Sequence, residues 1–167
     1  MDVLNLPFIS RIRRNHGLEH ATIHVLIQRS PYLSLVGRSD WEGFFIYGQV
    51  ETQDVESAAH EALARLQAGE RELAVHPRCG TVLATTGVLS GMAAFLALGA
   101  GNSRSRFRWA HLPEALMAAT AAAIVAQPLG LLLQQYITTS SDVGNLRIVR
   151  VYKQRGGSVP IHRIEIR

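Results

Sequence analysis

Two long stretches without a charged residue decide the fold of this chain: TVLATTGVLSGMAAFLALGAGNS at residues 81–103 and ALMAATAAAIVAQPLGLLLQQYITTSS at residues 115–141. A helix needs about 20 mostly apolar residues to cross the roughly 30 Å hydrocarbon core of a bilayer, at about 1.5 Å per residue. Both stretches are long enough. We therefore predict two transmembrane helices that form a hairpin, in preference to two Ala-rich helices buried in a soluble core.

Small residues predict how the two helices meet. Gly87 and Gly91 form a G-x-x-x-G pattern on the first helix, and Ala115, Ala119 and Ala123 repeat at the same spacing on the second. Such patterns let helix backbones approach closely in a membrane. We expect them to join the hairpin, and we expect the same helices to offer a route to homo-oligomers.

The charged residues predict orientation and exclude some partners. The net charge is +4, from 17 basic and 13 acidic residues. The connecting loop contains Arg104, Arg106 and Arg108, and the side that carries both chain ends has more basic residues near the membrane. Basic residues favour the cytoplasmic side of a membrane. We therefore expect an integral inner-membrane or plasma-membrane protein whose soluble part is cytoplasmic. Arginines beside membrane spans explain the positive charge, and without an aromatic-basic stripe we expect no nucleic-acid partner.

Export signals and disulfides are not expected. The first apolar stretch, VLNLPFI, is short, contains proline and lacks a small-residue cleavage site, so we expect no signal peptide. The chain has one cysteine, which excludes an internal disulfide and removes any need for an oxidising compartment.

The flanking sequence predicts a small sheet with helices. Helices are expected from an Asn15 N-cap to Arg29 and, on an amphipathic pattern ending at Gly69, over residues 52–69. Alternating patterns and turn residues predict strands at residues 32–36, 43–50, 72–76, 145–153 and 159–167.

The fold class is therefore α+β, a small sheet-plus-helix domain with an inserted two-helix transmembrane hairpin. We expect a metal-binding α+β region over residues 1–80 and the hairpin over residues 81–137. Residues 138–167 are expected to form a C-terminal β-hairpin that packs on the first region.

The segment HGLEH at residues 16–20 is the first candidate site, because it fits H-x-x-E-H. On a helix, His16, Glu19 and His20 lie on one face, and His24 continues the stripe as a further ligand-supporting or core histidine. Two imidazoles at this spacing can bind one Zn²⁺, and in inverted zinc peptidases the glutamate is the general base. The alternative is a buried helix whose histidines and glutamate hydrogen-bond to one another and to nearby arginines.

The segment HPRCGT at residues 76–81 is the second candidate site. It places His76 and the sole cysteine, Cys79, at zinc-knuckle spacing, and Cys79 at the amino end of the first membrane helix, where the helix dipole favours thiolate. His16, His20, His76 and Cys79 together offer four ligands suited to zinc. Otherwise Cys79 is a small buried residue and His76 a histidine at a strand end.

The pairing of HGLEH with a downstream HPRCGT that leads into a transmembrane helix resembles the YqhQ-like bacterial membrane proteins, a domain-of-unknown-function group described as predicted metal-dependent enzymes. The resemblance covers roughly residues 16–100. It implies metal dependence for the matching positions, namely His16, Glu19, His20, His76 and Cys79. This chain looks shorter than the usual members, with fewer membrane spans.

Three functions follow from these motifs. The first is a membrane-anchored zinc hydrolase, peptidase-like, with Glu19 as general base and a peptide substrate. The second is a non-enzymatic membrane protein with a closed His₃Cys zinc site, in which Glu19 orients a histidine. In the third, Cys79 is a nucleophile and His76 or His20 its base, without metal.

Overall fold

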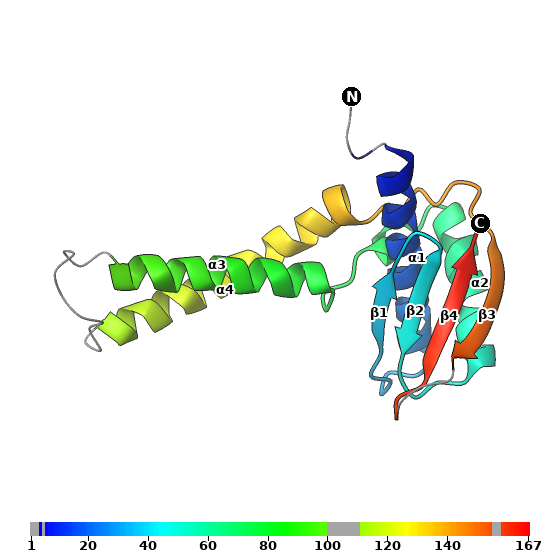
Figure 1. Ribbon diagram of the computed structural model, residues 1–167, viewed down its shortest axis with the longest axis horizontal. Coiled ribbons are helices and arrows are strands. Elements are labelled where there is room, and N and C mark those ends of the chain that lie inside the picture. The colour runs from blue at the N-terminus through cyan, green and yellow to red at the C-terminus, as the bar shows by residue number, and fades with distance from the viewer. Residues whose placement is uncertain (1–3, 5, 100–110, 155–157) are drawn as a thin grey trace. The chain divides into compact units, whose positions relative to one another are not determined.

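The computed structural model describes residues 4, 6–99, 111–154 and 158–167, and the predicted α+β class is confirmed. The chain divides into two compact units (Figure 1). The first comprises Met1–His76 and Gln135–Arg167, and the second comprises Pro77–Gln134. The three arginines of the connecting loop and residues 155–157 lie outside the described residues.

The first unit is built on a four-stranded antiparallel sheet in the order β1-β2-β4-β3. The strands are β1 (Val36–Ser39), β2 (Gly43–Tyr47), β3 (Ile148–Gln154) and β4 (Ile161–Ile166). The last strand of the chain pairs with β2, with Phe44 opposite Ile164 and Ile46 opposite His162. The segments before and after the apolar helices therefore share one sheet.

Two helices, α1 (Pro7–Arg29) and α2 (Thr52–Gln67), cover one face of this sheet. Figure 1 shows α1 behind β1 and β2, and α2 behind β4 and β3. Alternate strand residues point toward the helices, and Phe44, Ile46 and Ile164 are fully buried there. The amphipathic pattern of α2 is confirmed by burial of the predicted face, which comprises Val55, Ala58, Ala59, Ala62, Leu63 and Leu66.

Three local predictions were wrong. The strand expected at residues 32–36 is displaced along the chain, because β1 covers Val36–Ser39 and residues 32–35 are not part of it. The first helix begins at Pro7 rather than at an Asn15 cap, and Asn15 is buried within it, donating from Nδ2 to the carbonyl oxygen of Asp40 at 2.8 Å. The segment expected as a strand at residues 72–76 contains the 3₁₀ helix η2 (Arg71–Ala74) instead. Its adjacent residues Leu73 and Ala74 are both buried, which strand alternation would not allow on a one-sided sheet.

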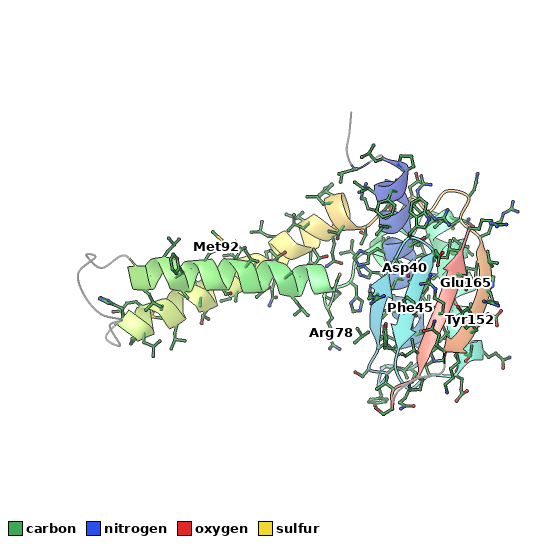
Figure 2. All side chains as sticks on the ribbon, viewed as in Figure 1. Asp40, Phe45, Arg78, Met92, Tyr152 and Glu165 are labelled. Carbon is green, nitrogen blue, oxygen red and sulfur yellow. The ribbon has the colours of Figure 1, made fainter. Side chains whose placement is uncertain are left out.

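The second unit is a pair of helices, α3 (Gly80–Gly99) and α4 (Leu112–Leu133). After Leu133 the chain continues into the π-helical turn η4 (Gln134–Thr138), so the second apolar helix runs over Leu112–Thr138. Both helices are long and apolar enough to cross a membrane. Only 6% of the most apolar 18-residue segment is buried in the first helix, and 11% in the second. Large apolar side chains are exposed, among them Met92, which Figure 2 labels. Phe95 is exposed as well. These helices are therefore not the buried core of a soluble domain.

The close contact between α3 and α4 does not use the predicted G-x-x-x-G pattern. A Cβ atom at Gly87 or Gly91 would meet open space, whereas one at Gly130 would lie 2.8 Å from the Cα atom of Val82. The prediction for Gly87 and Gly91 was therefore wrong. Gly130 on α4 is the residue that lets the two backbones approach.

Candidate metal centre

Helix α1 presents three histidines, one turn apart, along one side. His16, His20 and His24 follow the i, i+4 spacing, and His20 is buried while the other two are partly exposed. A glycine makes room for a neighbouring segment here, because a Cβ atom at Gly17 would clash with the main-chain oxygen of Ser140. The carbonyl oxygen of Arg13 also accepts a 2.9 Å hydrogen bond from the amide of Ser140. The residues after η4 are thus fixed against the histidine helix.

The structure adds His76 to these three rings. The ring centroids of His16 and His20 are 4.4 Å apart, those of His20 and His76 are 5.9 Å apart, and those of His24 and His76 are 4.9 Å apart. The four rings form a continuous row, the histidine row, in the order His16, His20, His76, His24. His76 comes from the segment after η2, so its place in the row depends on the fold and not on helical spacing.

Main-chain carbonyl groups fix the protonation of three of these rings. Nδ1 of His16 lies 3.0 Å from the oxygen of Thr138, and Nδ1 of His20 lies 2.9 Å from the oxygen of Ala74. A carbonyl oxygen only accepts hydrogen bonds, so each facing nitrogen carries a proton. In the neutral rings the lone pair is then on Nε2. Protein-bound zinc is usually ligated by histidines oriented in this way.

His24 has the opposite arrangement. Its Nε2 lies 2.9 Å from the main-chain oxygen of Val75, so the lone pair of the neutral ring is on Nδ1. This ring faces His76 edge-on. The sequence placed His24 a turn beyond the motif, as a supporting or core residue. In the structure it belongs to the histidine row.

Glu19 lies beside the row but points toward the sheet. Its carboxylate accepts a hydrogen bond from the hydroxyl group of Ser39 on β1, and the side chain is 4% exposed. A Cβ atom at Gly37 would overlap this carboxyl group. Burial raises the pKa of Glu19, while the nearby His16 and the Ser39 hydroxyl act in the opposite direction. Nothing in the sequence indicated that Gly37 and Ser39 lie beside Glu19, because only the packing of β1 against α1 brings them to the motif.

Cys79 belongs to the second unit and immediately precedes α3, at the helix amino end where the sequence placed it. Cys79, the sole cysteine of the chain, is buried. The main-chain amide of Thr81 donates to its Sγ atom at 3.4 Å. The Sγ atom also contacts the hydroxyl group of Thr81, at 3.7 Å. The structure thus brings His16, His20 and His76 together in the first unit and leaves Cys79 as a residue of the second.

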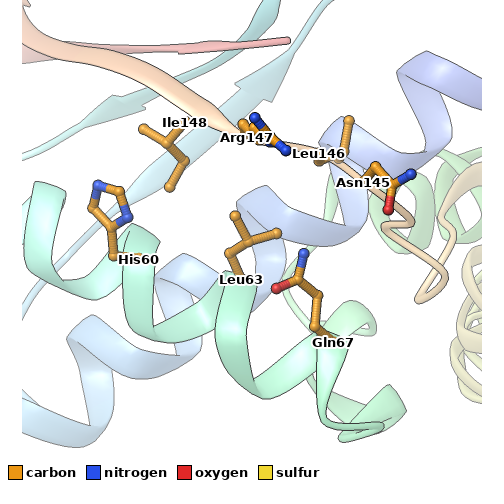
Figure 3. Close-up of a pocket in the computed structure, with 7 residues that line it drawn as sticks. All are labelled: His60, Leu63, Gln67, Asn145, Leu146, Arg147 and Ile148. Atoms are coloured by element: carbon orange, nitrogen blue, oxygen red, sulfur yellow. The ribbon is translucent and has the colours of Figure 1, made fainter.

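A pocket in the first unit lies away from this row (Figure 3). Its volume is about 400 Å³, and it is formed by α2 and the segment before and at the start of β3. The lining residues are His60, Leu63, Gln67, Asn145, Leu146, Arg147 and Ile148. None of the four histidines of the row lines it, so the candidate metal centre and this pocket are separate features.

Comparison with known proteins identifies a family. Residues 11–151 match DUF6391, a domain of unknown function. An uncharacterised protein of Picosynechococcus sp. is 35% identical over 166 residues, which cover 93% of this chain and 79% of that protein. No solved structure matches. The family matched by name is DUF6391 rather than the YqhQ-like group, and the match includes the histidine row and both apolar helices. The chain therefore belongs to the DUF6391 family.

Proposed function

We propose that this chain is a membrane-anchored zinc-binding protein whose metal centre is built on His16 and His20. The observation that carries the proposal is the pair of carbonyl contacts that leave Nε2 of both rings as the lone-pair nitrogen. Ring centroids 4.4 Å apart suit two imidazole nitrogens that share one ion at about 2.0–2.1 Å each.

His76 and Cys79 complete the proposed ligand set. His76 already belongs to the histidine row, and Cys79 follows it by three residues. Neutral imidazoles and a thiolate form the mixed nitrogen and sulfur set that zinc prefers over magnesium or calcium. The YqhQ-like resemblance adds a predicted metal dependence at the same positions.

The role of Glu19 separates two versions of this function. Zinc, when bound, supplies a Lewis acid that makes water more acidic, and Glu19 would accept a proton as the general base of a peptidase-like hydrolase. A buried carboxyl group one residue from His20 suits that role. The hydrogen bond from Ser39 and the packing against Gly37 favour the alternative, a closed structural site in which Glu19 holds the helix against β1.

The anchor consists of α3 and the helix over Leu112–Thr138. Their large exposed apolar side chains need an apolar environment, and a lipid bilayer provides it. Because both ends of this hairpin return to the first unit, the metal centre lies on one side of the membrane, which we assign to the cytoplasm. Membrane lipid is therefore the first partner, and homo-oligomers through the same helices are the second.

Metal content per chain tests the proposal. Elemental mass spectrometry of the detergent-purified protein is expected to find about one zinc per chain, falling to near zero in a His16→Ala/His20→Ala variant. His60→Ala is the matched control, because His60 is exposed on α2 and outside the row, and it should keep the metal. Equal metal content in all three proteins would overturn the zinc centre.

The Glu19→Gln variant then decides between the two versions. It should keep its zinc in both cases, since glutamine retains the size and the hydrogen-bond capacity that Ser39 needs. In the enzyme it abolishes hydrolysis of unstructured peptide substrates that the wild-type protein cleaves. Wild-type protein that holds zinc and cleaves no peptide would establish the structural site.

A further inference from the structure

The amino-terminal turns of α1 carry an unusual group of exposed apolar and aromatic side chains. Leu6 and Phe8 are 44% and 57% exposed, and Trp41 in the β1–β2 turn is 40% exposed. The rings of Phe8 and Trp41 stack with centroids 5.0 Å apart. These side chains lie outside the core of the first unit, and neither the histidine row nor the pocket uses them.

The end of the second apolar helix joins this group. Tyr136 is 62% exposed and Ile137 is 45% exposed. One guanidinium nitrogen of Arg13 donates to the carbonyl oxygens of Tyr136 and Thr139, each at 3.0 Å, and another donates to that of Leu4 at 3.5 Å. Arg13 thus holds the first turns of α1 against the last turn of the helix. We call Leu6, Phe8, Trp41, Tyr136 and Ile137 the aromatic patch.

Basic side chains surround the patch. Arg11 lies over the Trp41 ring at 5.0 Å and donates from Nε to its main-chain oxygen. Arg13 and Arg14 follow on α1, whose first turn contains no acidic residue. Three acids lie nearby: Asp40, which precedes Trp41 and is paired with Arg163, Glu42, which follows Trp41 and is exposed, and Asp142, which lies 3.9 Å from Arg14. With Arg163 included, four arginines stand beside these three acids, so the patch combines apolar rings with a small excess of positive charge.

We propose that the aromatic patch lies in the headgroup layer of an anionic membrane and holds the first unit against the bilayer surface. Tryptophan and tyrosine concentrate at this depth because an apolar ring meets lipid while its polar group meets water. Arginines beside them attract anionic headgroups. Tyr136 and Ile137 are also the two residues that precede Thr138 at the end of the candidate span Leu112–Thr138, so the patch is continuous with the proposed membrane segment.

The proposal rests on the membrane insertion put forward above, and the test uses the full chain. Trp109→Phe leaves Trp41 as the remaining tryptophan, since the chain has two. The protein is reconstituted into phosphatidylcholine vesicles that contain a minority of phosphatidylglycerol. Lipids brominated near the headgroup end of the acyl chain should quench Trp41 strongly. Omitting phosphatidylglycerol should weaken this quenching, roughly twofold.

A matched probe occupies the other end of α1. Tyr32 is 98% exposed and follows the end of α1 by three residues, and α1 itself runs about 30 Å from Phe8 to Arg29, at about 1.5 Å per residue. A Tyr32→Trp probe in a Trp41→Phe/Trp109→Phe background should show no quenching. Phe8→Ser should reduce quenching of Trp41, whereas Val149→Ser, which removes a 60% exposed apolar group from β3, should not.

The outcomes separate the patch from the anchor. A chain that an alkaline carbonate wash removes from vesicles overturns both membrane insertion and the patch proposal. A chain that stays in the vesicles while brominated lipid leaves Trp41 unquenched, or quenches the Tyr32→Trp probe equally, overturns the patch proposal alone. A Trp41 emission shift that follows protein concentration and not lipid composition means that a second copy covers the patch, and this also overturns it.

Discussion

The carboxyl group of Glu19 occupies the space that a side chain at Gly37 would need. One residue comes from the middle of α1 and the other from the edge strand β1, so the contact sets how closely the histidine helix lies against the sheet. Ser39, two residues along the same strand, donates its hydroxyl to the same carboxylate. The motif glutamate is therefore fixed by two small residues of β1.

Gly37→Ala is expected to destabilise the first unit by about 1–3 kcal/mol, because the added methyl group forces the buried Glu19 side chain away from Ser39. Thermal unfolding in detergent measures the change. The double variant Glu19→Ala/Gly37→Ala should lose less stability than the two single changes added together. Strict additivity would show that the two residues do not compete for the same space.

Asp40→Asn is expected to destabilise the protein by on the order of 2 kcal/mol, because Arg163 is 4% exposed and loses its paired charge. Two guanidinium nitrogens of Arg163 donate to Asp40, at 2.8 and 3.0 Å. The cost stays below that of a fully buried pair because Asp40 is 36% exposed. Glu42→Gln is the control. Glu42 is 79% exposed at 3.6 Å from Arg163, and removing its charge should change little.

The same pair predicts acid sensitivity. The hydrogen bonds and charge of Arg163, with the amides of Glu42 and Gly43, lower the pKa of Asp40 below its ordinary value of 3.8 against the opposing effect of burial. The unfolded state binds this proton first as the pH falls, so the stabilisation is complete above about pH 4 and is lost below it. In the Asp40→Asn variant the melting temperature should therefore depend less on pH in that range. If the melting temperature of the variant falls with pH as steeply as that of the wild type, Asp40 does not contribute to the acid sensitivity.

Periodicity was enough to predict the amphipathic helix at residues 52–69, the apolar helices and the alternating strands of the last 20 or so residues, because each pattern is local. It failed where tertiary contacts decide. Asn15 has the chemistry of a helix cap, yet its side chain donates to the β1–β2 turn and the helix continues past it. Gly37, Ser39 and Thr138 carry no local signal, although they complete the surroundings of the HGLEH motif.

Gly130→Val is expected to separate α3 from α4, because a Cβ atom at Gly130 would lie 2.8 Å from the Cα atom of Val82 and the backbone cannot move aside cheaply. Gly91→Val is the matched control, since a Cβ atom at Gly91 on α3 would meet open space. Cysteine pairs introduced across the two helices report their separation through cross-linking yield. The yield should fall in the first variant and stay constant in the second.

His162→Gln is expected to make stability less dependent on pH between about pH 7 and about pH 5. His162 is fully buried on the inner side of β4, and burial, with a contribution from Lys153 opposite, lowers its pKa below the ordinary 6.5. The unfolded chain therefore binds a proton that the folded chain resists, and wild-type stability declines as the pH falls below about 6.5. Melting temperatures across this range measure the slope, and the exposed His60→Gln variant should keep it.

The histidine row predicts a tautomer pattern that nuclear magnetic resonance can observe in ¹⁵N-histidine-labelled protein. Long-range nitrogen–proton spectra at about pH 8 should show His16 and His20 protonated at Nδ1 and His24 protonated at Nε2, because the three facing groups are carbonyl oxygens. Ala74 and Val75, the acceptors for His20 and His24, are adjacent residues, so one short segment imposes opposite tautomers on rings one helical turn apart.

Added zinc should shift the Nε2 signals of His16 and His20, whereas a shift at Nδ1 of His24 would place that ring among the ligands. Protonation of His16 at Nε2 in the metal-free protein would contradict the geometry on which the zinc centre rests.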